Sequence, residues 1–148
     1  MMTQAPDKGT VVVGVEEKAD SRGAIRAAAQ EARSRQAALV AVMAYSTNPA
    51  LGAPAGRPVA TFHRVDDERL VVESALRDAV VNALGEEADG VALRPVAGSA
   101  GRALVEVARE VNAQLIVLAS HGATSMLPGS VTQYMLRRAP CAVLIVPE

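Results

Sequence analysis

The C-terminal stretch LIVLASHGATSMLPGSVTQYMLRRAPCAVLIVPE, Leu115–Glu148, decides the fold. It begins with an apolar run at Leu115–Ala119, which predicts a buried strand. Ser120–Ser130 carries glycines near both ends and is interpreted as a loop. Val131–Arg138 is predicted to be a helix, which Pro140 ends, and Ala142–Val146 predicts a last buried strand. The order is therefore strand, glycine loop, helix, strand.

The same alternation extends upstream to Thr10. Strands are expected at Thr10–Val15, Ala38–Ala44 and Val91–Val96, because each is a short apolar run rich in β-branched residues or valine. Helices are expected between them, each with one apolar face. Their predicted ranges are about 20–34, with Asp20-Ser21 as the cap, Asp66–Glu87 and Arg102–Val111, the last after a turn at Gly98–Gly101. The expected inward-facing residues are Ile25, Ala28, Ala29, Ala32, Val72, Leu76, Ala79, Ala83, Leu104, Val107, Ala108 and Val111.

This order predicts an α/β fold with a single five-stranded parallel sheet and helices on both faces. The chain of 148 residues fits one domain, spanning 1–148, with a flexible N-terminus at 1–9 and a long loop at 46–65. In such sheets a ligand lies beyond the carboxyl ends of the strands, where the winding direction reverses. The loops after the first and fourth strands are therefore the candidate site.

Composition excludes several classes of protein. Hydrophobic residues make up 50% of the chain, but the aromatic side chains are only Tyr45, Phe62 and Tyr134, so stacking platforms for single-stranded nucleic acid are not expected. The net charge is −1, with no basic run that would suggest nucleic acid or a membrane surface as a partner. A single cysteine, Cys141, and the absence of a signal-peptide pattern predict a cytoplasmic protein.

The stretch after the fourth strand resembles the ending of the universal stress protein (UspA-like) family. That ending is an apolar strand, a loop written G-x2-G-x9-G-[ST], a helix, Ala-Pro-Cys and a last apolar strand. Here Ala139-Pro140-Cys141 and its flanking elements match, and the resemblance spans nearly the whole chain outside Ser46–Val65. It implies a Rossmann-like, adenine-nucleotide α-hydrolase-like fold, a stress-response role and an adenine nucleotide such as ATP, AMP or cyclic AMP, with Mg²⁺ if the ligand is ATP.

The resemblance also implies which residues hold the nucleotide. Phosphates would lie against the start of the last helix, where unpaired amides and the helix dipole favour an anion. An acidic residue ending the first strand would hold the nucleoside. The residues at these positions are Gly14, Glu16, Ala119, His121, Gly122, Gly129, Ser130 and Val131.

Three departures from the family pattern keep a second hypothesis open. Ala119 stands where the family has its first loop glycine, and Gly122 to Gly129 encloses six residues, three fewer than the motif. Glu16-Glu17-Lys18 replaces a stretch that resembles Asp-Gly-Ser in nucleotide-binding members. The alternative is a nucleotide-independent dimer that acts through an unknown protein partner. Homodimerisation through Ala142–Val146 is expected in either case, because an apolar edge strand favours pairing with another chain.

Catalysis is the weakest hypothesis. Nucleotide hydrolysis needs a positioned base or a water-orienting group, and neither a P-loop nor a partner base for Glu16 and Glu17 is evident. We therefore expect no dedicated enzyme, with weak ATP hydrolysis left open, and no catalytic or metal-ligating residues. A phospho-receiver domain is also excluded, because the third strand runs into Pro95-Val96-Ala97-Gly98 without an acceptor aspartate. Cys141 is interpreted as a small core residue.

Overall fold

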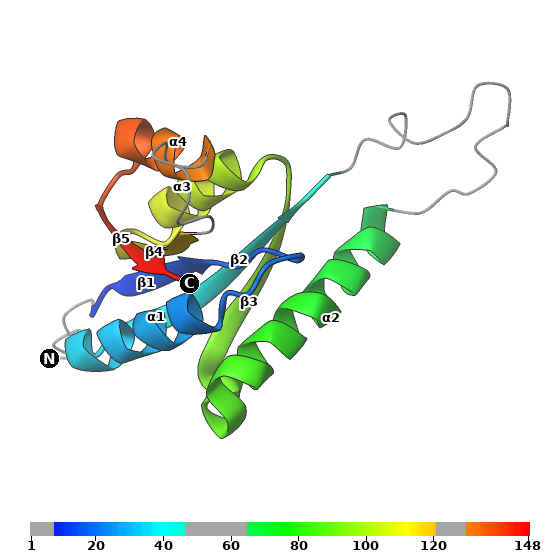
Figure 1. Ribbon diagram of the computed structural model, residues 1–148, viewed down its shortest axis with the longest axis horizontal. Coiled ribbons are helices and arrows are strands. Elements are labelled where there is room, and N and C mark those ends of the chain that lie inside the picture. Colours follow the sequence, from blue (N-terminus) through cyan, green and yellow to red (C-terminus); the bar gives the residue numbers. More distant parts are fainter. Residues whose placement is uncertain (1–7, 47–64, 121–129) are drawn as a thin grey trace, which may run out of the picture.

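A computed structural model describes residues 8–46, 65–120 and 130–148 of the chain, and of Val65 and Asp66 only the backbone. Its centre is a five-stranded sheet in the order β3-β2-β1-β4-β5, with every pair of neighbours parallel. Figure 1 shows the sheet with helices on both sides. The predicted five-stranded parallel α/β architecture is confirmed.

The elements alternate along the chain as predicted. Their bounds are β1 Thr10–Gly14, α1 Arg22–Arg35, β2 Ala38–Tyr45, α2 Val65–Leu84, the 3₁₀ helix η2 Gly85–Gly90, β3 Val91–Ala97, α3 Ala100–Glu110, β4 Ala113–Ser120, α4 Ser130–Arg138 and β5 Ala142–Pro147. Strands buried on both faces need apolar side chains in both directions, which explains their runs of Val, Leu and Ile.

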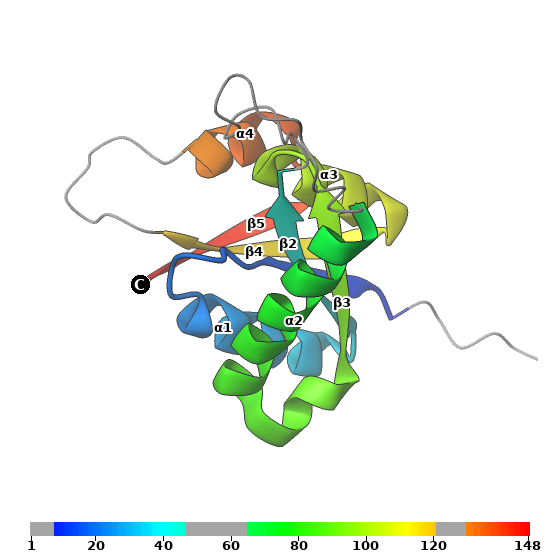
Figure 2. The ribbon, with the colours of Figure 1, turned by 90° about the vertical axis from the view of Figure 1, so that its right-hand side faces the viewer.

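The sheet separates two apolar clusters. Val11, Val13 and Val15 face α1 and α2, where Ile25 and Leu76 are fully buried. Val12 faces the other side, toward α3 and α4, and packs in the cluster that contains Met135. Figure 2 shows α1 and α2 side by side on one side of the sheet, and α3 and α4 on the other. The centre of the fold is therefore β1, whose middle residues are buried on both faces.

Most of the predicted inward-facing residues are buried. Ile25, Ala28, Ala29 and Ala32 all lie in the core of α1. In α2 the buried positions are Val72, Leu76, Val80 and Ala83, whereas the predicted Ala79 is only partly buried. In α3, Leu104, Val107 and Ala108 are buried and Val111 is partly buried.

Three local predictions were wrong. The helix expected to reach Glu87 ends at Leu84, because Gly85 adopts a left-handed φ of 62° that breaks the α-helical ladder, and a 3₁₀ helix follows. The turn expected at Gly98–Gly101 is shorter, since α3 already begins at Ala100. The predicted Asp20-Ser21 cap is wrong for Ser21, which stands at the N-cap of α1 but makes no side-chain capping bond, whereas the Asp20 carboxylate accepts the N–H of Arg22 at 3.0 Å.

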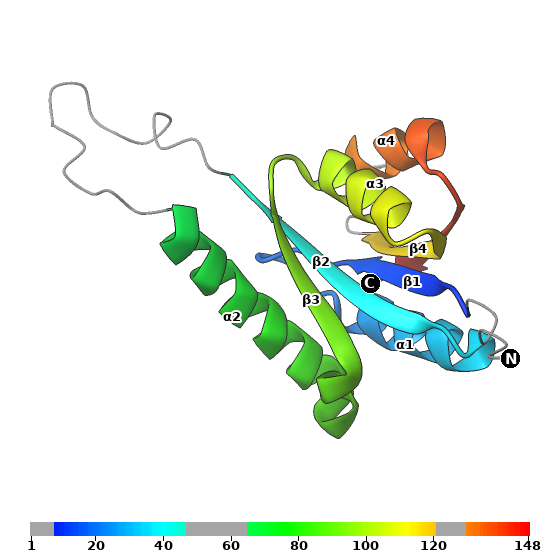
Figure 3. The same cartoon turned by 180° about the vertical axis from the view of Figure 1, so that it is seen from behind.

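Contacts from α1 hold the far end of α2. The Arg26 guanidinium donates to the carbonyl of Ala83 at 3.1 Å, so it satisfies one of the carbonyls at the end of α2. Arg33 pairs with Glu87 of η2 at 2.6 Å. In Figure 3, which shows the sheet from behind, α2 lies alongside β3, the edge strand farthest from β5.

Two predicted segments lie largely outside the described residues. They are the N-terminal 1–9, of which only Lys8 and Gly9 are described, and the loop 46–65, of which only Ser46 and the backbone of Val65 are described. Val65 already belongs to α2. The flexible N-terminus, the long loop and the single-domain organisation stay predictions.

Candidate functional site

The winding direction of the sheet reverses between β1 and β4. After β1 the chain returns through α1 to β2, on one side of β1, whereas after β4 it returns through α4 to β5, on the other side of β4. The two connections cover opposite faces of the sheet, so they diverge at the carboxyl ends of β1 and β4. In parallel α/β sheets this divergence opens the crevice in which ligands bind. The predicted location of the candidate site therefore agrees with the topology.

Gly14 is the last residue of β1, and its place is determined by packing. A Cβ at this position would lie 2.9 Å from Cδ2 of Leu118 and 3.0 Å from Cδ1 of Leu104. The latter residue belongs to the cluster under α3 and α4. Glycine here thus leaves room for two leucine side chains just below the candidate crevice.

Glu16 lies in the exposed loop after β1. Its backbone N–H donates to the hydroxyl of Ser21 at 3.3 Å, and that serine is 4% exposed. The Ser21 hydroxyl thus accepts a hydrogen bond from the loop and makes no capping hydrogen bond to α1. Glu16, Glu17 and Lys18 are all exposed, so this end of the crevice presents two carboxylates and one ammonium group to solvent.

On the β4 side, the described residues divide between the two faces of the sheet. Ala119 pairs with Val146 of β5 and packs against the cluster under α1 and α2. Ser130 is exposed and is the first residue of α4, and Val131 packs, half-buried, against the opposite cluster. Because α4 follows the carboxyl end of β4 and precedes β5, its N-terminal end lies at the same edge of the sheet as Ala119 (Figure 2).

The predicted residues His121, Gly122 and Gly129 lie outside the described residues. The topology brings Gly14, Glu16 and Ala119 to one edge of the sheet, together with the start of α4. The exposed Ser130 has a hydroxyl and stands in the first turn of a helix, whose amides lack intrahelical partners. This donor set suits a phosphate group.

The sequence analysis missed a charged pair at the start of α1. The Arg22 side chain contacts both oxygens of Asp20, the shortest distance being 2.8 Å, and the Arg22 backbone N–H donates to the same carboxylate at 3.0 Å. These hydrogen bonds lower the pKa of Asp20 to about 2. Asp20 in turn raises the pKa of Arg22, and the negative charge of Glu148 adds a smaller contribution in the same direction. Arg22 is therefore a cation that is already neutralised locally.

Glu148 was also missed, although its position could have been inferred from the period of two along β5. Leu144 and Val146 pack against the cluster under α1, so the residue two positions further along faces the same way. The Glu148 carboxylate accepts a hydrogen bond from the backbone N–H of Ala24 in the first turn of α1, at 2.9 Å. The carboxyl edge thus has a fourth acidic group beside Glu16, Glu17 and Asp20.

A surface hollow of about 370 Å³ adjoins this edge. It lies between the start of α1 and the C-terminal part of α2. Its lining residues are Ala19, Asp20, Ser21, Arg22, Ile25, Ala79 and Asn82. Polar groups at the start of α1 form one part of its lining, and Ile25 and Ala79 form its apolar floor. Because its walls come from α1 and α2, the hollow lies next to the crevice and not inside it.

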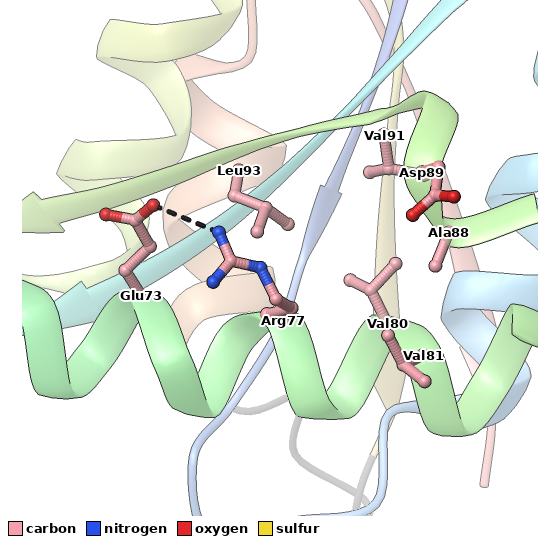
Figure 4. Close-up of a pocket in the computed structure, with 8 residues that line it drawn as sticks. All are labelled: Glu73, Arg77, Val80, Val81, Ala88, Asp89, Val91 and Leu93. Atoms are coloured by element: carbon pink, nitrogen blue, oxygen red, sulfur yellow. Dashed lines mark hydrogen bonds and ion pairs between the residues drawn. The ribbon is translucent and has the colours of Figure 1, made fainter.

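A second hollow, of about 320 Å³, lies away from the candidate site. Figure 4 shows it between α2, η2 and the first half of β3, with Arg77 reaching toward Glu73 at 3.4 Å. Val80, Val91 and Leu93 supply its apolar lining. It is near the amino ends of the strands, where parallel sheets do not usually bind ligands.

Within residues 8–46, 65–120 and 130–148, no group of three His, Cys, Asp or Glu side chains is placed to hold a metal ion. Over the same ranges, no helix has the length and apolarity that a bilayer crossing requires.

Comparison with known proteins agrees with the geometry. The model of the universal stress protein family matches residues 9–147. Among solved structures, a universal stress protein in complex with cAMP is 30% identical with a TM-score of 0.66, covering 94% of this chain and 96% of that one. UspA from Lactobacillus plantarum is 24% identical with a TM-score of 0.69, covering 96% and 99%. Among curated protein sequences, none matches the chain.

A further structure, a universal stress protein from Archaeoglobus fulgidus in complex with dAMP, is 20% identical with a TM-score of 0.62, covering 93% of this chain and 97% of that one. At this identity the likeness concerns the fold alone. The 30% identical structure and the family match over residues 9–147 are likenesses of sequence as well.

Proposed function

Because this chain belongs to the universal stress protein family, we propose that it is a regulatory module that binds an adenine nucleotide between the loops after β1 and β4. The observation that carries the proposal is the reversal of winding between these two strands, with the start of α4 at the same edge. The cAMP complex of the 30% identical structure supports an adenine nucleotide as the ligand class. Binding rather than catalysis is proposed, because the described part of the site, which leaves out 121–129, offers anion donors and no positioned base.

The roles of the residues follow from their chemistry. The Ser130 hydroxyl and the amides of the first turn of α4, including that of Val131, would receive phosphate oxygens. Glu16 would accept hydrogen bonds from nucleoside hydroxyls, as carboxylates do in dinucleotide-binding folds. His121, Gly122 and Gly129 would complete the phosphate loop, and Ala119 would border it. Mg²⁺ would accompany ATP, since a divalent cation offsets repulsion between its phosphates and Glu16 and Glu17.

Calorimetric titration of the purified protein with cyclic AMP, AMP and Mg-ATP tests the proposal. A Ser130→Ala variant should bind the preferred nucleotide about tenfold more weakly, because a hydrogen bond to a charged group contributes about 1.5 kcal/mol. The matched control is Ser34→Ala, which changes an exposed serine near the C-terminal end of α1, at the opposite edge of the sheet. Absence of heat and of a thermal shift with all three nucleotides at millimolar concentration would refute nucleotide binding.

We also propose a homodimer through β5, which would serve either a nucleotide-binding module or one that acts only through a protein partner. Within the described sheet β5 pairs with β4 alone, so its other edge is open. Its residues Val143, Leu144, Ile145 and Val146 are apolar and only half-buried. An edge strand of this kind is a template for pairing with a second copy.

Light scattering with size-exclusion chromatography tests the dimer. Ala142→Lys adds a charge at an exposed position of β5 and should shift the protein toward the monomer, because charged side chains oppose pairing between edge strands. Ala92→Lys is the matched control, since Ala92 is an exposed alanine on the other edge strand, β3. A dimer that is lost only in the Ala92 variant, or a wild-type protein that is monomeric at all concentrations, would contradict the proposed interface.

A further inference from the structure

The hollow between α2 and the edge strand β3 has no role in the candidate nucleotide site. Val80 and Val81 of α2 and Val91 and Leu93 of β3 line it, and Ala88 of η2 lies at one end (Figure 4). All five of these side chains are apolar, and the volume between them is about 320 Å³. The hollow is therefore an apolar depression on the surface, at the edge of the sheet opposite to β5.

An apolar row along α2 extends this hollow. Leu70, Arg77 and Val81 recur at i, i+7 and i+11, a spacing that places them on one face of the helix. Leu70 is 63% exposed and Val81 is 46% exposed, and the methylene groups of Arg77 lie between them. At 1.5 Å per residue the row is about 16 Å long, which equals about three turns of a helix. The described residues leave this face of α2 uncovered.

The open edge of β3 does not favour a partner strand. Among the described strands β3 pairs with β2 alone. The N–H of Gly98 donates to the carbonyl of Tyr45 in β2, and successive N–H groups alternate between the two edges of a strand, so the nitrogen of Pro95 faces the open edge. Proline has no N–H to donate there, and it opposes edge-to-edge pairing. A helix, which brings side chains and not backbone amides, is therefore the better occupant of this surface.

The segment that forms one wall of the hollow is acidic. Residues 67–90 contain seven acidic and two basic residues, a net charge of −5 in a chain whose net charge is −1. Glu87 pairs with Arg33 of α1 at 2.6 Å. In the part of the chain that the structure describes, Glu86 and Asp89 have no ion-pair partner, and both are exposed. Asp89 also lines the hollow, so the charge next to the apolar surface favours a cationic partner.

We propose that the α2–β3 surface, which is the hollow together with the row from Leu70 to Val81, is a docking site for a helix of a partner protein. That helix has apolar side chains on one face and lysine or arginine beside them. Its apolar side chains enter the hollow and cover the row, and its cations lie toward Glu86 and Asp89. Recognition of a helix in a groove uses apolar anchors of this kind, spaced along one helix face. The surface is separate from the loops after β1 and β4, so the proposal holds whether or not a nucleotide binds.

Fluorescence anisotropy with a labelled synthetic peptide tests the proposal on the full chain. The probe is an amphipathic peptide of about 18 residues, with leucine on one face and lysine on the other. We expect saturable binding with a Kd that increases with salt concentration, because screening weakens the attraction between lysine and the acidic surface. The same peptide with glutamate in place of every lysine should bind at least about tenfold more weakly.

Two matched variants separate the surface from the overall charge. Val81→Lys should weaken binding of the lysine peptide about tenfold, since it removes an apolar contact at the hollow and repels the probe. Val71→Lys is the control, because Val71 is a 65% exposed valine of the same helix that does not line the hollow. It adds the same charge and should change the Kd less than about threefold. Melting temperatures of both variants check that they fold.

A third variant tests the charge at the hollow. Asp89→Asn should weaken binding of the lysine peptide about threefold in low salt and have little effect at about 0.5 M salt. Equal losses in Val81→Lys and Val71→Lys would show attraction by net charge alone and would overturn the proposal. The proposal would also fail if the lysine peptide did not bind saturably, or if the glutamate peptide bound equally well.

Light scattering distinguishes a partner helix from a second copy of the chain. A wild-type dimer that becomes monomeric in Val81→Lys, and not in Ala142→Lys, would show that another copy of this chain covers the α2–β3 surface. That result would overturn the proposal of a partner helix. A Val81→Lys variant with the oligomeric state of the wild type and weakened peptide binding would support it.

Discussion

Gly14→Ala tests whether the glycine that ends β1 serves packing or ligand binding. The added methyl group would lie 2.9 Å from Cδ2 of Leu118 and 3.0 Å from Cδ1 of Leu104, both below normal contact distance. Overpacking of this kind costs about 1–3 kcal/mol. Alanine recovers about 0.4–1 kcal/mol by restricting the unfolded chain, since Gly14 has no left-handed φ that would oppose the substitution.

The net destabilisation should therefore be about 1 kcal/mol, which lowers the melting temperature by about 2–4 °C in a protein of this size. Calorimetric melting of the free protein measures it. The penalty should be smaller in a Leu104→Ala background, because that substitution removes one of the two side chains that the new methyl group meets. Nucleotide affinity should change little, as the methyl group points into the cluster under α3 and α4.

The reasoning would be refuted if Gly14→Ala left the melting temperature unchanged and abolished nucleotide binding. That result would mean that the methyl group added at position 14 lies in the path of the ligand and not in the core. An equal penalty in the wild-type and Leu104→Ala backgrounds would also contradict the packing account, since the two residues would then act independently.

Three further predictions concern the rest of the molecule. Leu76→Ala in α2, where the side chain is fully buried, should cost about 3 kcal/mol in urea unfolding, whereas Leu70→Ala on the same helix, at 63% exposure, should cost less than about 0.5 kcal/mol; similar losses would contradict the burial pattern. Asp20, whose pKa is lowered to about 2 by Arg22, stabilises the folded state above the ordinary pKa of 3.8. Its contribution should be lost as the pH falls from about 4 toward 2, and an NMR titration with a midpoint near 4 would refute the pairing. Burial raises the pKa of the Cys141 thiol above its ordinary value of 9.0, so its alkylation by iodoacetamide should be slow at pH 8 and should still increase above about pH 10; a rate that levels off by about pH 10 would show an ordinary thiol.

Much of the fold was predictable from local pattern. The β-branched runs of β1 and β2 and the spacing of Ile25, Ala28 and Ala32 in α1 follow from periodicity, because burial on two faces or on one helix face requires these arrangements. The end of α2 was predicted less well. Gly85 is itself a signal for the end of a helix, because a glycine just after the last helical residue readily adopts the left-handed conformation, and the prediction of a helix to Glu87 passed over it. The contacts of Arg26 and Arg33 with that end could not be predicted, since both residues come from α1.

The candidate site was likewise predictable from the sequence only in part. Its edge of the sheet could be located from the order of strands and helices, whereas Gly14, Glu16, Ala119, Ser130 and Val131 were assigned to it through the resemblance to the universal stress protein family. The packing role of Gly14 could not be predicted, because Leu104 and Leu118 approach it from a helix and a strand that are distant in the sequence.

The sequence by itself therefore determined the order of elements, the parallel sheet and the edge at which the candidate site lies, since these depend on local periodicity and on the handedness of the crossovers. Only the tertiary structure decided how charge is distributed at that edge. Glu148 and Ala24 are 124 positions apart in the chain, and no local pattern relates a strand end to the first turn of a distant helix. They meet because one face of β5 packs against α1. This packing brings the carboxylate within hydrogen-bonding distance of an amide that has no partner within its own helix.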